Sequence, residues 1–343
     1  MKTELFDYSL PKELIAQHPE KDRSSSRLFV YHRKTGTIEH RLFKDIDAYL
    51  VEGDVLVLNE SKVLPARLKM ERHTGGMVEL LLTEMIDKRR WRCLVKGIRA
   101  KKGETEVSLG EIKATIRWID SSWVCEFING NDVFDIIDKH GKPPLPPYIK
   151  RKDGADDENG DLEKYQTVYA RIPGSIAAPT AGFHFTEGLL KKLTEKGIII
   201  VKLTLHIGIG TFFLIKAEDV EGHTMHREFY DISPSEISCI RQAKRSGRRV
   251  ICCGTSVVRT LETICGEDGN SHKPLAGFTG LFIYPGYRFK VVDGLITNFH
   301  LPRSTPLLLV SAFTGHEELI KCYKEAIEKG YRFYSYGDAM MIL

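Results

Sequence analysis

The stretch that most constrains the fold spans residues 178–213, and it is typical of a loop, a helix, a strand and a second loop. Thr186 is placed to cap the helix, and Gly197 stands where helices commonly end in a left-handed residue. The β-branched run 198–205 is typical of a strand that is buried on both faces. A helix followed at once by such a strand predicts a doubly wound, largely parallel α/β sheet.

Histidines stand at both ends of this stretch and after a second predicted strand. His184 lies in the first loop, His206 directly follows the strand, and His300 closes the run Thr297-Asn298-Phe299-His300. The carboxyl ends of parallel strands meet at one edge of a sheet, where α/β proteins bind their ligands. We therefore expect the three imidazoles to gather there. The alternative at each position is a structural histidine whose hydrogen bonds are satisfied by its neighbours.

The pattern changes at residue 63, and the 343-residue chain is expected to form two domains. Between residues 63 and 150, short alternating segments separated by turns such as Thr74-Gly75-Gly76 predict a small antiparallel β-barrel. In residues 1–62 and 151–343, strands alternate with helices, which predicts a doubly wound, largely parallel sheet. Its expected elements include helices over residues 9–16 and 255–264 and strands over residues 281–283 and 331–335. The acidic tract 153–161 is expected to be an exposed loop or linker.

Composition narrows the class of protein without identifying a partner. The sequence has no run of eighteen apolar residues and no hydrophobic leader, so we expect a soluble, cytoplasmic protein without a membrane segment. Its seven cysteines show no CxxC spacing, which indicates reduced thiols. His223 and His226 form a close pair near Glu228, but no acidic cluster or cysteine pair supports a metal site. We expect no metal.

A possible anion site opens the helix that follows Cys253. A strand that runs through Gly254 into Thr255 and Ser256 presents backbone N–H groups at a helix N-terminus. Neither the GxGxxG nor the GxxxxGK[ST] spacing is present, so a single anion such as a carboxylate fits better than a dinucleotide. An ordinary N-cap would leave the same pattern.

The predicted barrel carries a strong local charge. Between Ser61 and Gly103, twelve Lys and Arg residues face four Asp and Glu residues, a difference of +8. The densest part is Lys88-Arg89-Arg90-Trp91-Arg92, with an aromatic residue inside it. Basic residues interleaved with aromatics suit a phosphate backbone and a splayed base. A solvated strand face is the alternative.

Taken together, these motifs resemble those of one family. The stretches FDYSLPKELIAQHP, GDVLVLNESKVLPARL, APTAGFHFT, HIGIGTF, GTSVVRTLE, YPGYRF, TNFHLPRST and FYSYGDAMMI occur in order between Phe6 and Ile342. The chain resembles the S-adenosylmethionine:tRNA ribosyltransferase-isomerases of queuosine biosynthesis over its whole length. Its departures at Phe183, Ile207 and Ile209 exchange one apolar residue for another.

The resemblance implies a reaction that composition could not reveal. The family uses S-adenosylmethionine as a consumed ribosyl donor, and the acceptor is an aminomethyl-7-deazaguanine base at the wobble position of tRNA. Adenine and methionine leave, and the ribose becomes the epoxycyclopentanediol of epoxyqueuosine. The resemblance also implies an α/β domain built from both chain ends and interrupted by a β-rich insert. No metal or redox cofactor is required, and we expect a monomer.

The resemblance also implies roles for particular residues. A general base must reach the ribose C5′, and a second group should assist the departing adenine, so His184, His206 and His300 are the catalytic candidates, with His184 preferred as the base. The expected S-adenosylmethionine contacts are Thr180, Gly182, Gly208, Gly210, Thr211, Thr255, Ser256, Arg259, Asn298 and Asp338. Among them, Arg259 and the helix N-terminus at Thr255 would hold the methionine carboxylate. The expected tRNA contacts are Lys62, Arg67, Lys88, Arg89, Arg90 and Arg92.

Two functions from other classes remain as alternatives. An ordinary S-adenosylmethionine-dependent tRNA methyltransferase would need a glycine-rich loop after the first strand of a Rossmann unit, and none is present. A non-catalytic RNA-binding module would leave the polar residues at the strand ends unexplained. The products distinguish the three: free adenine, S-adenosylhomocysteine, or no turnover.

Overall fold

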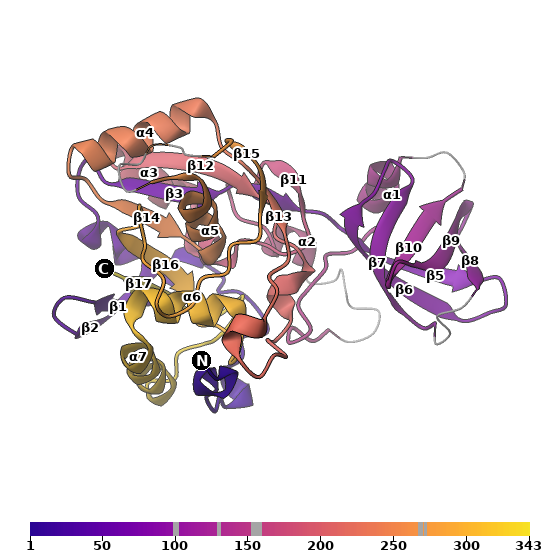
Figure 1. Ribbon diagram of the computed structural model, residues 1–343, viewed down its shortest axis with the longest axis horizontal. Coiled ribbons are helices and arrows are strands. Elements are labelled where there is room, and N and C mark those ends of the chain that lie inside the picture. Colours follow the sequence, from indigo (N-terminus) through magenta and orange to yellow (C-terminus); the bar gives the residue numbers. More distant parts are fainter. Residues whose placement is uncertain (99–102, 129–131, 152–159, 267–269, 271–272) are drawn as a thin grey trace. The chain divides into compact units, whose positions relative to one another are not determined.

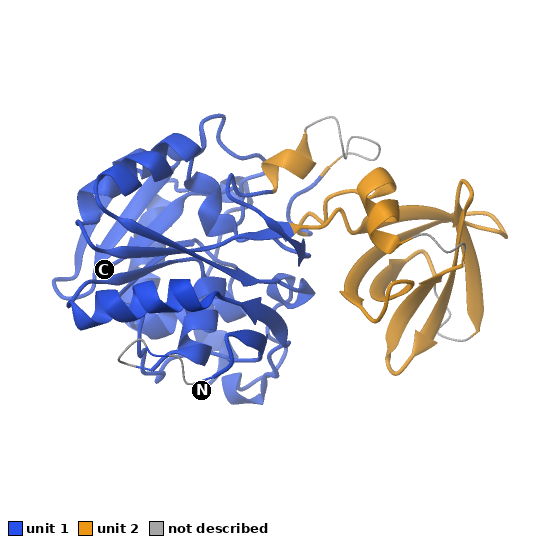
Figure 2. Ribbon diagram, turned by 90° about the horizontal axis from the view of Figure 1, so that it is seen from above, with its two compact units in different colours: residues 1–62, 147–150, 166–343 blue, residues 63–146, 151–165 orange. Residues whose placement is uncertain are grey.

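The computed structural model describes residues 1–98, 103–128, 132–151, 160–266, 270 and 273–343. The chain divides into two compact units, which Figure 2 colours separately. The α/β unit comprises residues 1–62, 147–150 and 166–343. The barrel unit comprises residues 63–146 and 151–165.

Two short segments lie on the other side of the expected domain boundaries. Residues 147–150 belong to the α/β unit, because the Tyr148 hydroxyl bonds Ser335 Oγ at 2.6 Å and the Lys150 N–H donates to Gln17 Oε1 at 2.8 Å. Residues 151–165 belong to the barrel unit, where Arg151 and Asp161 form a buried ion pair at 2.7 Å. Most of the acidic tract 153–161 lies outside the described residues.

A nine-stranded sheet forms the centre of the α/β unit (Figure 1). Its order is β15-β13-β12-β3-β14-β16-β17-β1-β2. The pairs β12/β3, β3/β14, β14/β16 and β17/β1 are parallel, and the other neighbours are antiparallel. The strands are β1 (Arg27–His32), β2 (Thr37–Leu42), β3 (Val55–Asn59), β12 (Ile199–Leu205), β13 (Glu228–Asp231), β14 (Val250–Cys253), β15 (Ala276–Thr279), β16 (Gly294–Asn298) and β17 (Ala339–Ile342). The prediction of a doubly wound α/β sheet is confirmed, and its four central strands, β12, β3, β14 and β16, are parallel.

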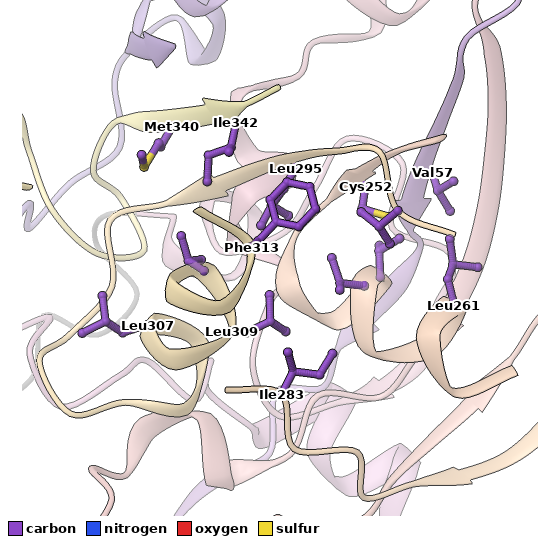
Figure 3. Packing of buried hydrophobic residues seen from close by; sticks show 14 of the residues in the cluster. Val57, Cys252, Leu261, Ile283, Leu295, Leu307, Leu309, Phe313, Met340 and Ile342 are labelled. Atoms are coloured by element: carbon purple, nitrogen blue, oxygen red, sulfur yellow. The ribbon is translucent and has the colours of Figure 1, made fainter. Parts of the chain in front are cut away.

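Helices cover both faces of this sheet, because its central strands are apolar on both sides. On β3, Val55 and Val57 enter one core, while Leu56 and Leu58 enter the other. Figure 3 shows part of the first core, in which Val57, Cys252 and Leu295 of the sheet lie near side chains of helices α5 and α6. The helices are α3 (Glu187–Glu195), α4 (Pro234–Arg245), α5 (Thr255–Ile264), α6 (Thr305–Thr314) and α7 (His316–Glu328).

The helix and strand of residues 178–213 form as the sequence predicts. Thr186 Oγ1 accepts the Leu189 N–H at 3.1 Å at the start of α3, and Gly197 has a φ of 86° directly after the helix. Helix α5 has the predicted bounds. These signals succeed because each depends on neighbouring residues only.

Three predicted elements are wrong. The helix expected over residues 9–16 is only a 3-10 turn, Lys12–Leu14. No strand forms over residues 281–283 or 331–335, which the structure describes throughout. In the segment 331–335, Tyr331 and Phe333 are fully buried, but Tyr334 has a φ of 71°, which is incompatible with an extended strand. The aromatic run therefore fills the core from a loop, and the last strand is β17.

The barrel unit confirms the predicted antiparallel barrel. Six strands close in the order β10-β7-β6-β5-β8-β9, so this sheet has no open edge. A short helix, α1 (Val133–His140), follows the strands. The strands are β5 (Arg67–Arg72), β6 (Met77–Met85), β7 (Arg90–Lys96), β8 (Glu104–Leu109), β9 (Ile112–Ile119) and β10 (Ser122–Phe127).

All seven cysteines are free thiols, and six of them are buried. Among the helices that the described residues form, none is long and apolar enough to cross a membrane.

Candidate active site

Four strand ends meet at one edge of the large sheet. Because β12, β3, β14 and β16 are neighbouring and parallel, their carboxyl ends lie on the same side. His206 follows β12, Asn59 ends β3, Thr255 follows β14 through Gly254, and Asn298 ends β16. The outer two of these strands are three spacings apart, roughly 14 Å. The edge thus gathers residues that the sequence analysis selected separately.

Asn59 joins these strand ends, and the sequence analysis missed it. The side chain is fully buried. Its Nδ2 donates to the Leu205 carbonyl at 3.0 Å and to Ser256 Oγ at 3.2 Å, while its Oδ1 accepts the N–H groups of Leu205 and Ser61. These four bonds use the amide fully. The only sequence signal is a polar residue at the end of the apolar run 55–58.

His184 is buried in a network of hydrogen bonds. Its Nδ1 lies 2.6 Å from Ser26 Oγ, and its Nε2 lies 3.2 Å from Asn298 Nδ2. Thr180 Oγ1 donates to Asn298 Oδ1 at 2.8 Å, and Ser26 Oγ donates to the Arg23 carbonyl at 3.2 Å. With the Asn298 amide assigned this way, Asn298 Nδ2 donates to Nε2, and Ser26 Oγ, which donates to the Arg23 carbonyl, is free to accept from Nδ1. Nδ1 therefore carries the imidazole proton, and Nε2 accepts. Both ring nitrogens are therefore occupied.

Burial keeps two of the three histidines neutral. It lowers the pKa of His184 to about 3, with smaller contributions from the cations Arg332 and Arg23. Burial also lowers the pKa of His300 to about 3. His300 Nε2 lies 2.7 Å from Thr297 Oγ1, and the His300 N–H donates to the Tyr323 hydroxyl at 3.0 Å.

His206 is held in a different way. Its Nδ1 lies 2.8 Å from Ser61 Oγ, and one face of its ring stacks on Phe229 with centroids 5.8 Å apart and an angle of 25°. Backbone at Gly174 covers the ring, since a Cβ there would lie 2.5 Å from Cε1 and Nε2. Within the described part of the chain, no hydrogen bond engages Nε2. Burial lowers the pKa of His206, and the residue remains partly exposed.

Two buried serines lie behind His206. Ser61 Oγ and Ser175 Oγ are 2.6 Å apart, and the Ile207 N–H donates to Ser175 Oγ at 2.9 Å. One orientation uses every hydroxyl proton: Ser175 donates to Ser61, Ser61 donates to Nδ1, and the imidazole proton lies on Nε2. The reverse orientation places the imidazole proton on Nδ1 and leaves Nε2 as an acceptor. Conversion of one form into the other requires a proton to leave one ring nitrogen and a proton to reach the other, and the two hydroxyl groups reorient with that change.

The loop after His206 is anchored by a buried ion pair. The Gly208 N–H donates to Glu228 Oε1 at 2.8 Å, and Glu228 in turn pairs with Arg259 of α5. Arg259 also donates to the Leu281 carbonyl at 2.9 Å. For Arg259 to hold a methionine carboxylate, as we expected from the sequence, this pair would have to open. Sequence analysis missed Glu228 in this role.

Other expected contact residues have identifiable structural roles. Asp338 is buried and accepts the N–H groups of Arg27 and Arg332 at 2.9 and 2.8 Å, and burial raises its pKa. Gly182 is buried against the Tyr169 hydroxyl, which would lie 2.0 Å from a Cβ. Gly210 meets the His226 ring, which would lie 2.7 Å from a Cβ, and Thr211 follows it in the 3-10 turn Ile209–Phe212.

The basic residues of the barrel differ in how they are paired. Arg90 pairs with Asp87 at 2.7 Å, and Arg92 approaches Glu84 at 3.4 Å. Lys88 and Arg89 are exposed, and the described residues offer their side chains no ion pair. The remaining expected tRNA contacts are Lys62, which is exposed, and Arg67, which lies 4.0 Å from Glu79. Arg99, Lys101 and Lys102 lie outside the described residues.

The aromatic residue inside this basic run is not available to a ligand. Trp91 is only 3% exposed and packs against Phe134, with ring centroids 5.7 Å apart. Trp118 and Trp123 pack edge to face at 5.2 Å. The expectation of an aromatic residue interleaved with the basic surface at Trp91 is therefore wrong, because strand alternation turns its side chain into the barrel core.

Over the ranges that the structure describes, no group of three or more His, Cys, Asp or Glu side chains could hold a metal ion. His223 packs edge to face on Phe282 at 5.0 Å, and its pKa is lowered by burial and by His226.

Comparison with known proteins identifies the family. A family model described as "Queuosine biosynthesis protein" matches residues 3–342. S-adenosylmethionine:tRNA ribosyltransferase-isomerases from Clostridioides difficile and Caldanaerobacter subterraneus are both 49% identical to the chain, with full coverage of both sequences. The crystal structure of S-adenosylmethionine tRNA ribosyltransferase from Thermotoga maritima matches with a TM-score of 0.56 at 37% identity, covering 99% of this chain and 100% of that one. The chain therefore belongs to the queuosine biosynthesis family of S-adenosylmethionine:tRNA ribosyltransferase-isomerases, and it is an enzyme.

Proposed function

We propose that the enzyme transfers and isomerises the ribosyl moiety of S-adenosylmethionine onto the aminomethyl-7-deazaguanine wobble base of tRNA. The product is epoxyqueuosine-tRNA, and adenine and methionine are released. The observation that supports this most directly is the polar edge at the ends of β12, β3, β14 and β16, in a chain that matches the family over residues 3–342. Ligands of open α/β sheets bind at such strand ends.

The chemistry requires proton transfers at two places on the donor. The sulfonium makes the neighbouring C5′ hydrogens acidic, so a base must remove one of them, and the departing adenine benefits from a proton. His206 Nε2 can perform either task, because the hydroxyl groups of Ser61 and Ser175 support both tautomers of its ring. We therefore assign the reactive imidazole to His206.

The sequence analysis favoured His184 as the base, but the contacts of this residue suit a positioning role. Its Nε2 accepts from Asn298, and that bond would have to break before the nitrogen could take a proton. His184 then fixes the Asn298 amide, which together with Thr180 would contact the nucleoside. His300 is a further candidate, held by Thr297.

The amino end of α5 would bind the methionine carboxylate. Its N-cap is Gly254, which has no side chain to satisfy the first-turn N–H groups, so those at Thr255 and Ser256 can donate to an anion. Gly208, Gly210 and Thr211 would line the opposite side of the donor. Asp338 and Gly182 would act indirectly, by shaping the edge.

We further propose that the exposed cations of the barrel hold the tRNA, that the enzyme acts as a monomer in the cytoplasm, and that it needs no metal or redox cofactor. Lys88 and Arg89 are the first candidates for phosphate contacts, because no acidic side chain among the described residues forms an ion pair with them.

The test is product analysis. The enzyme is incubated with S-adenosylmethionine and tRNA that carries the aminomethyl-7-deazaguanine base, and released adenine is measured by chromatography. Free adenine supports the proposal, whereas S-adenosylhomocysteine would indicate a methyltransferase and no turnover would indicate an RNA-binding module. The same tRNA with guanine at the wobble position is the matched control, and it should release no adenine.

A further inference from the structure

A row of three rings crosses the outer strands of the large sheet and ends at His206. On β13, Glu228 and Tyr230 are buried, while Phe229 points to the opposite face. Phe229 stacks on the His206 ring and faces Phe278 of β15, its partner in the register, with centroids 5.6 Å apart at 71°. We call Phe278, Phe229 and His206 the aromatic row. Figure 1 shows the strands β12, β13 and β15 that carry it.

The outer end of the aromatic row is exposed and has a cation beside it. Phe278 is 58% exposed, the highest value among the large apolar side chains that the structure describes. The Arg227 guanidinium lies 5.4 Å from the centroid of its ring. Burying an aromatic ring away from water lowers the free energy, and a phenylalanine that is exposed to this extent does not contribute that stabilisation. A ligand that covers the ring would supply it.

A cavity of about 590 Å³ adjoins Phe278. Its lining includes Tyr287 and the cations Lys273, Arg288 and Lys290. Glu262 is the one acidic side chain among the described residues of the lining, and it is 1% exposed. Its carboxylate accepts the N–H groups of Lys290 and Val291 at 2.9 and 3.0 Å and the Tyr287 hydroxyl at 3.1 Å, so its oxygens are occupied by these donors. Lys290 Nζ donates to the Glu262 carbonyl at 2.6 Å, whereas Arg288 is exposed and has no ion pair among the described residues. The cavity therefore presents at least the charge of Arg288 beside an exposed ring.

This combination fits one chemical class of partner. Unpaired nucleotides have a flat base, which stacks on an aromatic ring, and a phosphate, which binds Lys and Arg. A partner protein with an apolar surface could cover the ring but would make no favourable contact with the cations. Since the aromatic row leads to His206, nucleotides stacked along it would lie next to the proposed reactive imidazole.

We propose that the aromatic row and the adjoining basic cavity bind unpaired nucleotides of the RNA substrate. Bases stack on Phe278, and backbone phosphates contact Arg288 and its neighbouring cations. This inference rests on the proposed function, because that function supplies an RNA with an unpaired loop. The alternative is that Phe229 and Phe278 are a cross-strand pair that only stabilises the sheet edge.

The test compares RNA binding by Phe278 variants. Fluorescence anisotropy measures the affinity for a labelled tRNA transcript with guanine at the wobble position and for a fully paired RNA duplex. Phe278→Ala should weaken binding of the transcript roughly 5- to 150-fold, the range for loss of one stacked base, and should leave duplex binding unchanged. Phe278→Trp should retain transcript binding, whereas Phe278→Leu should not. Arg288→Ala should lower the salt dependence of binding by roughly one unit of slope.

Two controls and three outcomes make the test decisive. Ile199→Ala removes an exposed apolar side chain from the other end of β12, and Lys34→Ala removes an exposed cation from the turn between β1 and β2; neither should change binding. Transcript binding that survives Phe278→Ala overturns the inference, and so does full rescue by Phe278→Leu, which retains bulk but cannot stack. If the wild type binds no tRNA, the proposed function itself fails.

Discussion

His184 and His206 lie at the same sheet edge, yet their surroundings differ in one decisive respect. Around His184, Ser26 and Asn298 occupy both ring nitrogens, and Thr180 holds the Asn298 amide. Around His206, Ser61 occupies one nitrogen, while Phe229 and Gly174 hold the faces of the ring. A fixed ring with one uncommitted nitrogen is suited to proton transfer, whereas a fully bonded ring is suited to holding its neighbours in place. The density of a motif around a histidine therefore does not reveal which role it plays.

The largest effect that we expect comes from His206→Ala. Removing a general acid or base typically lowers the rate about 10²–10⁴-fold. Adenine release should fall by that factor, with nearly unchanged affinity for S-adenosylmethionine by calorimetry. Exchange of the C5′ hydrogens with deuterium, if it is detectable in the wild type, should stop. His32→Ala, which removes a histidine paired with Glu39 away from the edge, is the control.

The same measurements on His184→Ala test whether the roles of the two histidines are reversed. If His184→Ala stops C5′ exchange and His206→Ala does not, then His184 is the base, as the motif alone suggested. If the comparison holds, His184→Ala should lower the rate less and lower the stability more, because Asn298 and Ser26 lose a buried partner at a cost of about 1–3 kcal/mol each.

A smaller effect should appear in the dependence of stability on pH. The pKa of His184 and of His300 is about 3 in the folded state, below the value of 6.5 for an unperturbed histidine. The unfolded chain therefore binds more protons between these values, so stability is present above pH 6.5 and is lost as the pH falls. From pH 6 to pH 5, each histidine should cost about 1 kcal/mol.

Urea unfolding at the two pH values measures this loss. His184→Gln should lower the stability at both, but its loss on acidification should be about 1 kcal/mol smaller than that of the wild type. An equal loss in both proteins would show that His184 is hydrated in the folded state, and the contrast with His206 would then disappear.

On the barrel, the pairing of the cations predicts unequal effects on tRNA binding. Replacing Lys88 and Arg89 by Ala should reduce the slope of log affinity against log salt by up to about two units, one for each lost phosphate contact. Replacing Arg90 and Arg92 should reduce it less, because Asp87 and Glu84 already neutralise part of their charge. Equal effects would show that the ion pairs with Asp87 and Glu84 do not matter for binding, and no effect at all would show that the run is a solvated surface.

The smallest expected effect is that of chelation. Exhaustive treatment with a chelator should leave adenine release unchanged, with the fold monitored by circular dichroism. If added zinc restored activity lost to the chelator, a metal would be part of the enzyme, and His223 and His226 would be the first residues to substitute.

Much of the fold could be predicted because its signals are local. The cap at Thr186, the glycine at 197 and the apolar run of β3 each depend on a few neighbouring residues. The loop at 331–335 could not be predicted, because its aromatic residues have the composition of a strand and only the tertiary structure places them in a loop.

The sequence could predict that the strand ends meet at one edge, but it could not predict the contacts among their side chains. Asn59 and Ser256 are separated by 197 residues, and Ser26 and His184 by 158. No local pattern links such pairs, so the sequence could not show that His184 is fully bonded. It could not show that Glu228 pairs with Arg259 either, since a glutamate is usually exposed to solvent.

The position of β17 has a consequence for how the enzyme is made. This strand lies between β16 and β1, so it joins the early hairpin β1–β2 to the rest of the sheet, although it is the last strand to leave the ribosome. The barrel strands pair only among themselves, so that unit can complete its sheet during translation. Ser26 must wait, because β1, the strand that directly follows it, is anchored through β17. The nascent enzyme should therefore display a finished barrel before it has a working catalytic edge, and chaperones would meet it in that state.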